Sequence, residues 1–248
     1  FLRTNGYDDI YAQENYPRKE VVNSFGVPDH YLYRYALQKL QQQKQPFMAT
    51  LLSISNHPPY VIPEWFHANS KEEELQIVEY ADDALRIFFK QAAEQPWYGN
   101  SVFVLLGDHG KLTGSPECEM PQCLNHIPLI IHAPGLAPEE IDSWCMQMDV
   151  QPTLLSLLGI RAEQEHFGQN ILQKPRSMAL YTADNMIGAR SDGHLYIYEP
   201  GTGTEWFYKS AADNKVVYCE EPDSTLLYMK RTLFSTLQTA QEEIKKHE

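Results

Sequence analysis

An aspartate and a histidine stand side by side in the sequence Gly107-Asp108-His109-Gly110, directly after an apolar run. A carboxylate oxygen and an imidazole nitrogen supply half of a ligand set that suits Zn or Mn. The flanking glycines allow a sharp turn and leave space for a ligand to approach. A structural role is the alternative, with the aspartate capping a turn and the histidine lying on the surface. Asp108 and His109 are therefore candidate metal ligands.

A second candidate centre is formed by Asn56 and His57, which precede two prolines at 58 and 59. The histidine can hydrogen-bond an anionic oxygen or bind a metal, and the amide of Asn56 can donate a hydrogen bond. A histidine that caps a loop carbonyl is the structural alternative. Both residues are candidates for substrate binding.

His126 is the third candidate for substrate binding, but it comes before an apolar run rather than after one. If the strand that follows is parallel to the others, His126 lies at the wrong end of the sheet. It joins the other candidates only if the loop from residue 111 to 125 folds back over the site. Asp149 is more simply interpreted as a helix cap.

The candidates are separated by elements that alternate between strand and helix up to about residue 160. Short apolar runs favour buried strands, and apolar residues at intervals of three and four favour helices. Helix starts are indicated by Asp29, by Ser70 with Glu73 as a capping box, and by Asp149. The predicted elements are helix 29–40, strand 47–54, helix 70–93, strand 101–106, strand 129–132 and helix 149–158.

The last third of the chain changes character, with strands that follow one another across short turns and a final helix at 224–247. The predicted strands are 179–182, 186–190, 194–199 and 206–209. The fold class is therefore α/β, with a largely parallel sheet covered by helices and a small antiparallel C-terminal subdomain. In such sheets, ligands bind outside the carboxyl ends of the strands. We place the two parts at residues 1–175 and 176–248 of one domain.

The charge balance excludes one class of partner. The 248 residues carry 33 acidic and 20 basic side chains, a formal net charge of −13. A nucleic acid is therefore not an expected partner, because its recognition depends on clustered Lys and Arg. An anionic substrate would have to be received by a bound metal or by a local positive patch.

Two further features concern the cellular context. No apolar run approaches the roughly 20 residues that span a bilayer, and the chain opens at Phe1 without a signal peptide. We interpret this opening as part of a longer polypeptide, with a processed N-terminus as the alternative. Of the four cysteines, Cys118 and Cys123 could form a disulfide in an oxidising compartment. A zinc site there is less favoured, and free thiols are the other alternative.

Taken in order, four motifs resemble the sulfatase-like branch of the alkaline phosphatase superfamily. They are Ser55–Tyr60, Gly107–Gly110, His126–Gly135 and Met148–Gly159. The pattern is most similar to lipoteichoic acid synthase and phosphoglycerol transferase enzymes. Two N-terminal segments, Asn5–Asp9 and Ser24–Asp29, also resemble those enzymes. The resemblance covers about residues 1–160.

This resemblance implies a metal-assisted transfer or hydrolysis of phosphate or sulfate esters, most like phosphoglycerol transfer to cell-envelope lipids or glycans. It makes Asp108 and His109 ligands of a divalent ion, Mn or Zn, and it places His57 against the phosphate. The ion would lower the pKa of a Thr, Ser or formylglycine nucleophile. The resemblance also implies action at the extracytoplasmic face of a bacterial membrane, with an anchor in a missing N-terminal region.

The chain departs from the family pattern in its nucleophile. The family places that residue and a further carboxylate ligand in the first half of the domain, and neither has a match here. The formylglycine pattern Cys-x-Pro-x-Arg is absent, and Thr113 and Thr153 have no matching context. We therefore expect no catalytic residue within this chain and no turnover by the chain alone.

Three interpretations remain open at this point. The first is a fragment of a metal-dependent transferase or hydrolase, whose nucleophile lies upstream. The second is a non-catalytic relative that binds anions or glycans, because it lacks a nucleophile. The third is a free-standing sulfatase-type enzyme with an unusual nucleophile.

Overall fold

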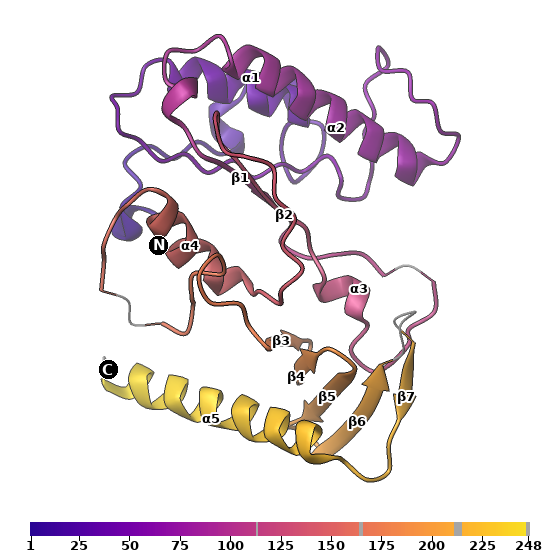
Figure 1. Ribbon diagram of the computed structural model, residues 1–248. Coiled ribbons are helices and arrows are strands. Elements are labelled where there is room, and N and C mark those ends of the chain that lie inside the picture. Colours follow the sequence, from indigo (N-terminus) through magenta and orange to yellow (C-terminus); the bar gives the residue numbers. More distant parts are fainter. Residues whose placement is uncertain (113, 164–165, 211–214, 247–248) are drawn as a thin grey trace. The chain divides into compact units, whose positions relative to one another are not determined.

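A computed structural model describes residues 1–112, 114–163, 166–210 and 215–246 (Figure 1). The chain divides into two compact units. Unit 1 contains residues 1–103 and 132–136, and unit 2 contains residues 104–131 and 137–248. Each unit is described by itself.

Unit 1 is built around two helices, α1 (Asp29–Leu40) and α2 (Glu73–Ala92). Both match the predicted helices, and their apolar faces meet in one core formed by Leu37, Phe88, Ala92 and Trp97. Short 3₁₀ turns stand around them. These turns are η1 (Arg3–Asn5), η2 (Gln13–Asn15), η3 (Arg18–Glu20) and η4 (Tyr98–Asn100).

The side chains at the starts of these helices do not act as predicted. Asp29 is the first residue of α1, and its carboxylate accepts hydrogen bonds from the backbone N–H groups of Ile54 and Ser55 instead of capping the helix. The capping box at Ser70 does not form, because α2 begins only at Glu73. The Ser70 hydroxyl accepts from the backbone of Glu72.

The predicted strand at 47–54 is wrong, since these residues form no strand in the structure. Met48 and Leu52 are 74% and 75% exposed. A strand requires a neighbour for its backbone N–H and C=O groups, and no described residue forms a ladder with this segment. The apolar composition of residues 47–54 is therefore compatible with a strand, but the segment has no neighbouring strand to pair with among the described residues.

The other two strands predicted in the first part of the chain are present. They are β1 (Phe103–Leu106) and β2 (Leu129–His132), which pair in a two-stranded sheet. Between them lies the short helix α3 (Gln122–Asn125). After β2 come the 3₁₀ turn η5 (Gln147–Asp149) and helix α4 (Val150–Leu157), which matches the predicted helix and ends before Gly159 at a positive φ of 68°.

The C-terminal part of unit 2 is the antiparallel subdomain that the sequence predicts. Its sheet has the order β3-β4-β5-β6-β7, and only β7 was not predicted. The strands are β3 (Met178–Ala183), β4 (Met186–Ser191), β5 (His194–Glu199), β6 (Thr204–Ser210) and β7 (Val216–Tyr218). The final helix is α5 (Ser224–Lys246), and the predicted end at His247 lies outside the described residues.

Both faces of the five-stranded sheet are covered. Helix α5 packs on one face through Leu226, Met229 and Leu233 (Figure 1). On the other face Met120 is fully buried, and the Tyr208 hydroxyl donates to the Glu119 carboxylate at 2.5 Å. The subdomain therefore holds the segment that leads into α3 and His126. None of the described helices is both long and apolar enough to cross a membrane.

Candidate functional site

Asp108 and His109 lie just beyond the end of β1, where the sequence places them. Their side chains are 79% and 69% exposed, and the Asp108 Oδ2 and His109 Nε2 atoms are 3.9 Å apart. The backbone N–H of His109 donates to Asp108 Oδ1 at 2.9 Å. The turn has therefore brought one oxygen and one nitrogen to the same exposed place.

The hydrogen bond of the His109 ring fits a metal ligand. Its Nδ1 lies 2.7 Å from the carbonyl oxygen of Gly110. A carbonyl only accepts, so Nδ1 is the donor, and in the neutral form of the ring Nε2 keeps a free lone pair. Metal-binding histidines commonly donate their second ring N–H in this way. Asp108 and His109 thus fit two ligands of a divalent ion, although the described residues hold no group of three potential ligands.

The loop that carries His126 folds back onto the same region of unit 2. The Gly110 N–H donates to the carbonyl of Leu124 at 2.9 Å. A Cβ atom at Gly110 would overlap the Cys123 carbonyl oxygen and would lie 3.4 Å from that of His126. Gly110 is therefore required by a close approach of backbone to backbone. The backbone of His126, whose side chain is exposed, thus lies near Gly110, and a part of His126 in the site stays a prediction.

Asn56 and His57 lie in unit 1, on an exposed loop that follows the buried Ser55. The His57 Nδ1 atom is 2.6 Å from the carbonyl oxygen of Pro58, and its ring centroid is 4.0 Å from that of Phe25. The Nδ1 proton is thus used locally, and Nε2 donates to an anion only when the ring is protonated. This exposed nitrogen is suited to a phosphate or sulfate oxygen.

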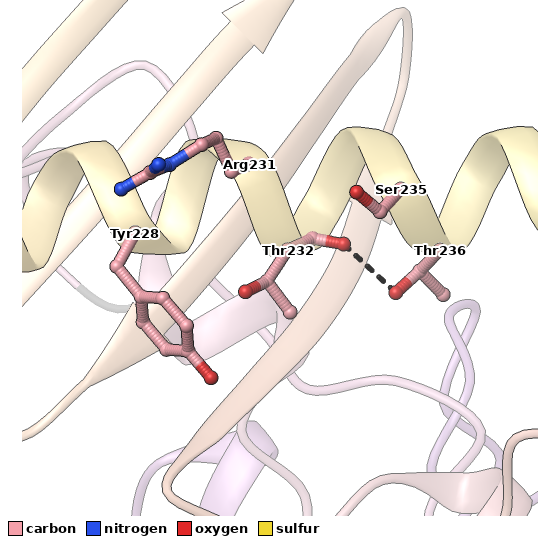
Figure 2. A pocket seen from close by; sticks show the side chains of 5 residues that line it. All are labelled: Tyr228, Arg231, Thr232, Ser235 and Thr236. Carbon is pink, nitrogen blue, oxygen red and sulfur yellow. Dashed lines mark hydrogen bonds between the residues drawn. The ribbon is translucent and has the colours of Figure 1, made fainter.

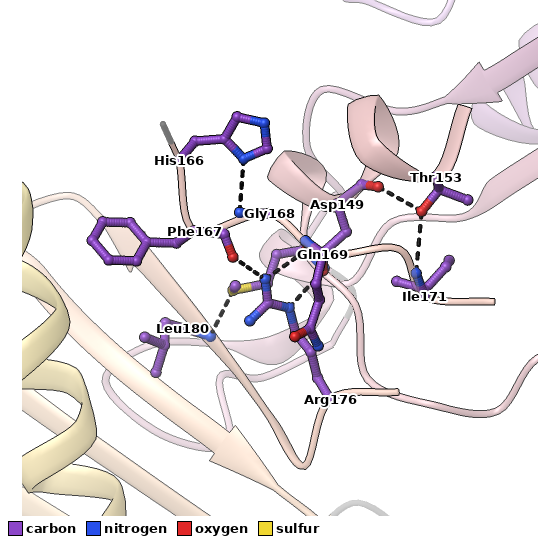
Figure 3. A network of polar contacts seen from close by, with 10 residues as sticks. Asp149, Thr153, His166, Phe167, Gly168, Gln169, Ile171, Arg176 and Leu180 are labelled. Carbon is purple, nitrogen blue, oxygen red and sulfur yellow. Dashed lines mark hydrogen bonds and ion pairs between the residues drawn. The ribbon is translucent and has the colours of Figure 1, made fainter. Parts of the chain in front are cut away.

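The network around Asp149 was missed by the sequence interpretation (Figure 3). Asp149 is fully buried and stands at the N-cap position of α4, as the sequence predicts, but its side chain caps no N–H group of that helix. Its carboxylate accepts from the N–H groups of Met146 and Gln169 and from two nitrogens of Arg176. Arg176 lies 27 residues away, outside every motif, so no local signal could have paired the two side chains.

Neither threonine that was considered gains a catalytic context. Thr153 is fully buried, and its hydroxyl donates to the Asp149 carbonyl at 2.6 Å and accepts from the Ile171 N–H (Figure 3). Thr113 lies outside the described residues. No catalytic nucleophile is therefore assigned within the part of the chain that the structure describes.

The cysteines are free thiols, so the disulfide between Cys118 and Cys123 is not formed in this structure. The Cys118 thiol is half-buried and donates to the carbonyl oxygen of Met120. Burial raises the pKa of Cys118 to about 11. This thiol is therefore neutral at physiological pH, and it is not a candidate nucleophile.

A pocket on α5 contains none of the candidates (Figure 2). Its lining consists of Tyr228, Arg231, Thr232, Ser235 and Thr236. All five belong to one helix, and the Thr236 hydroxyl donates to the backbone carbonyl of Thr232 at 2.9 Å. This hollow is therefore a feature of the helix surface, separate from the Asp108–His109 pair.

The fold defines the class of protein. A crystal structure of a protein in the alkaline phosphatase superfamily from Vibrio parahaemolyticus matches 96% of this chain and 60% of its own, with a TM-score of 0.80 and 26% identity. A 2-O GAG sulfatase structure, BT1596, matches at a TM-score of 0.56 and 15% identity, which supports the fold alone. The predicted alkaline phosphatase-like α/β class is confirmed.

The family follows from the sequence comparison. Residues 1–160 match the Sulfatase family, and the chain belongs to that family. It is 28% identical to lipoteichoic acid synthase 1 of Bacillus subtilis (strain 168) over 222 residues, which are 80% of this chain and 35% of that protein. It is 26% identical to lipoteichoic acid synthase of Staphylococcus aureus (strain USA300), over 68% of this chain and 30% of that protein. The chain thus spans about a third of the length of these relatives.

Proposed function

We propose that this chain is part of a metal-dependent enzyme that transfers or hydrolyses phosphate or sulfate esters. The proposed activity is most like that of a phosphoglycerol transferase acting on cell-envelope lipids or glycans. The observation that carries it is the Asp108–His109 pair, with an exposed carboxylate oxygen and the His109 Nε2 atom 3.9 Å apart. The lipoteichoic acid synthase relatives favour a phosphate ester and the envelope as the place of action.

Each candidate side chain has a distinct part in this proposal. Asp108 and His109 would hold a divalent ion, Mn or Zn, which supplies charge neutralisation and a lowered nucleophile pKa when bound. His57 would donate from its protonated Nε2 to an ester oxygen, and the Asn56 amide would donate to a second one. His126 would face the anion from the folded-back loop. The nucleophile and the remaining ligands would come from outside this chain.

The proposal includes the organisation of the whole protein. Residues 1–175 would form part of the catalytic domain, and residues 176–248 would extend the same domain, because the antiparallel sheet buries Met120 and so holds the loop before His126. The place of action would be the extracytoplasmic face of a bacterial membrane.

The test measures the binding of Mn²⁺ to the purified chain. Binding is monitored by electron paramagnetic resonance, as a loss of the signal of free Mn²⁺. We expect weak binding at one site, because two ligands provide only part of a coordination shell. Asp108→Asn and His109→Gln should each weaken it at least tenfold. Asp142→Asn removes an exposed carboxylate elsewhere in unit 2 and should leave binding unchanged.

The outcomes separate the two main interpretations. Equal Mn²⁺ binding by all four proteins, or no binding by any, would contradict the metal site at Asp108 and His109. In that case, retention of a phosphate-ester analogue by the wild-type chain would favour the non-catalytic, anion-binding alternative. Loss of analogue binding in His57→Gln, with Mn²⁺ binding intact, would support the division of roles between the two histidines.

A further inference from the structure

Gln147 reaches back to the candidate metal ligands from the turn η5. Its Nε2 atom lies 3.3 Å from the carbonyl oxygen of Gly107 and 3.5 Å from that of Asp108. The side chain is exposed, so these contacts are not a by-product of burial in a core. One amide group thus bridges two consecutive backbone carbonyls of the candidate site.

These two carbonyls have a particular relation to Asp108. They belong to the peptide groups on either side of its Cα atom. Because peptide groups are planar, fixing both of them fixes φ and ψ of Asp108. These dihedrals set the direction in which the carboxylate leaves the backbone. They also aim the His109 N–H, which donates to Asp108 Oδ1 at 2.9 Å.

Gln147 is itself held by the buried carboxylate at the other end of η5. Asp149 Oδ2 accepts from the Met146 N–H at 2.8 Å, which closes the turn around Gln147. The same carboxylate binds Arg176 through Nε at 2.7 Å and Nη2 at 2.5 Å, and it accepts from the Gln169 N–H at 2.8 Å (Figure 3). A carboxylate satisfied by four donors in a buried site leaves the turn little freedom.

We propose that Gln147 is a positioning residue for the Asp108–His109 pair. The buried Asp149–Arg176 network fixes η5, and Gln147 transmits that fixed position to the backbone on both sides of Asp108. This inference rests on the proposed function, since it assigns a purpose to the geometry of the two ligands. It adds a role for a residue that contacts the backbone of the candidate ligands through its side-chain amide.

The test uses backbone amide exchange, which reports local order without requiring a metal. Gln147→Met keeps the length of the side chain and removes the donor. The amides of His109 and Gly110 should then exchange about fivefold faster, the effect of losing one typical hydrogen bond. Gln147→Lys restores a donor of similar reach and should return the exchange rates towards those of the wild type. Gln151→Met changes an exposed glutamine on α4 and serves as the matched control.

Mn²⁺ affinity provides the functional readout, measured on the same proteins by electron paramagnetic resonance. We expect about fivefold weaker binding by Gln147→Met and no change in Gln151→Met, with the same melting temperature for both. A general loss of stability would lower the melting temperature and accelerate exchange throughout unit 2, which would contradict a positioning role.

Besides a general loss of stability, two results would overturn the inference, and one further result concerns only the proposed function. Unchanged exchange at His109 and Gly110 in Gln147→Met would show that the amide does not hold the turn. Faster exchange with unchanged Mn²⁺ affinity would show that the held geometry does not serve the ligands. If the wild-type chain binds no Mn²⁺, the metal site fails, and the exchange rates still decide whether Gln147 orders this backbone.

Discussion

Two buried aspartates, Asp29 in unit 1 and Asp149 in unit 2, hold the segments that carry the candidate residues. Asp29 is 2% exposed and accepts from the backbone of Ile54 and Ser55, just before His57. Asp149 is fully buried and holds η5, whose Gln147 contacts the backbone at Asp108. In both units an exposed candidate side chain lies next to, or is contacted by, a segment whose backbone hydrogen-bonds to a buried carboxylate.

The two carboxylates differ in how their charge is compensated. Asp149 has a guanidinium partner in Arg176, whose side chain is only 15% exposed. For Asp29, the hydrogen bonds within the described ranges come from backbone N–H groups, and it stands at the N-terminus of α1, where the helix dipole favours an anion. Removal of one side chain can therefore leave the Asp149 charge without its counter-ion, whereas Asp29 depends on the backbone.

The largest expected effect is that of Arg176→Met. It leaves the Asp149 carboxylate buried without its partner, and breaking a buried pair from one side costs about 3–5 kcal/mol. We expect the free energy of unfolding, measured by urea titration, to fall by that amount. The double variant Arg176→Met, Asp149→Asn should recover part of the loss, because the buried charge is then removed as well.

Arg86→Met is the matched control for burial. Arg86 contacts Asp83 at the same 2.5 Å distance, but its side chain is 63% exposed. A surface pair of this kind contributes about 0–1 kcal/mol. Equal destabilisation by Arg176→Met and Arg86→Met would mean that burial does not distinguish the two pairs.

Asp29→Ala should have a smaller effect, about 1–3 kcal/mol, because it leaves the N–H groups of Ile54 and Ser55 without their acceptor. The expected local result is faster amide exchange at these two residues. Ser55→Ala provides the comparison, since it removes only the hydroxyl that accepts from the Asp29 N–H at 3.0 Å. If Ser55→Ala destabilises unit 1 more than Asp29→Ala, the Asp29 carboxylate is not the main group that holds residues 54 and 55.

Elements with strong local patterns could be predicted from the sequence. Helices α1 and α2 carry apolar residues at helical spacing, and the four predicted antiparallel strands are separated by clear turn signals. The segment 47–54 has an equally apolar composition, yet it lacks a partner among the described residues. A β-strand forms only when its backbone pairs with a neighbouring strand. The composition of one segment does not show whether such a neighbour exists.

The candidate site shows the same limit. Asp108 and His109 were found because they are adjacent and follow an apolar run, and His126 was tied to them by a stated condition on the loop. Gln147 and Arg176 were not found, because each acts on residues 27 to 40 positions away. Side chains that position a site through such contacts leave no local pattern, and Asp149 was accordingly interpreted as a simple helix cap.

The smallest expected effect concerns pH and belongs to unit 1. The His30 Nδ1 atom is 2.6 Å from the hydroxyl of the buried Tyr80. Burial, and then the charge of Arg34, lower the pKa of His30 below its usual value of 6.5. The folded state therefore favours the neutral ring, whose Nδ1 accepts the Tyr80 proton.

The sign of the pH dependence follows from this shift. Above pH 6.5 the ring is neutral in both states, and the stabilisation is fully present. As the pH falls below 6.5, the unfolded chain takes up the proton first, so stability is lost until the pH has passed the lower folded pKa. His30→Gln should reduce the drop in urea midpoint between pH 8 and pH 5, whereas His67→Gln, at an exposed position of the same unit, should not. An equal drop in both variants would mean that the His30–Tyr80 contact is not the group that senses pH.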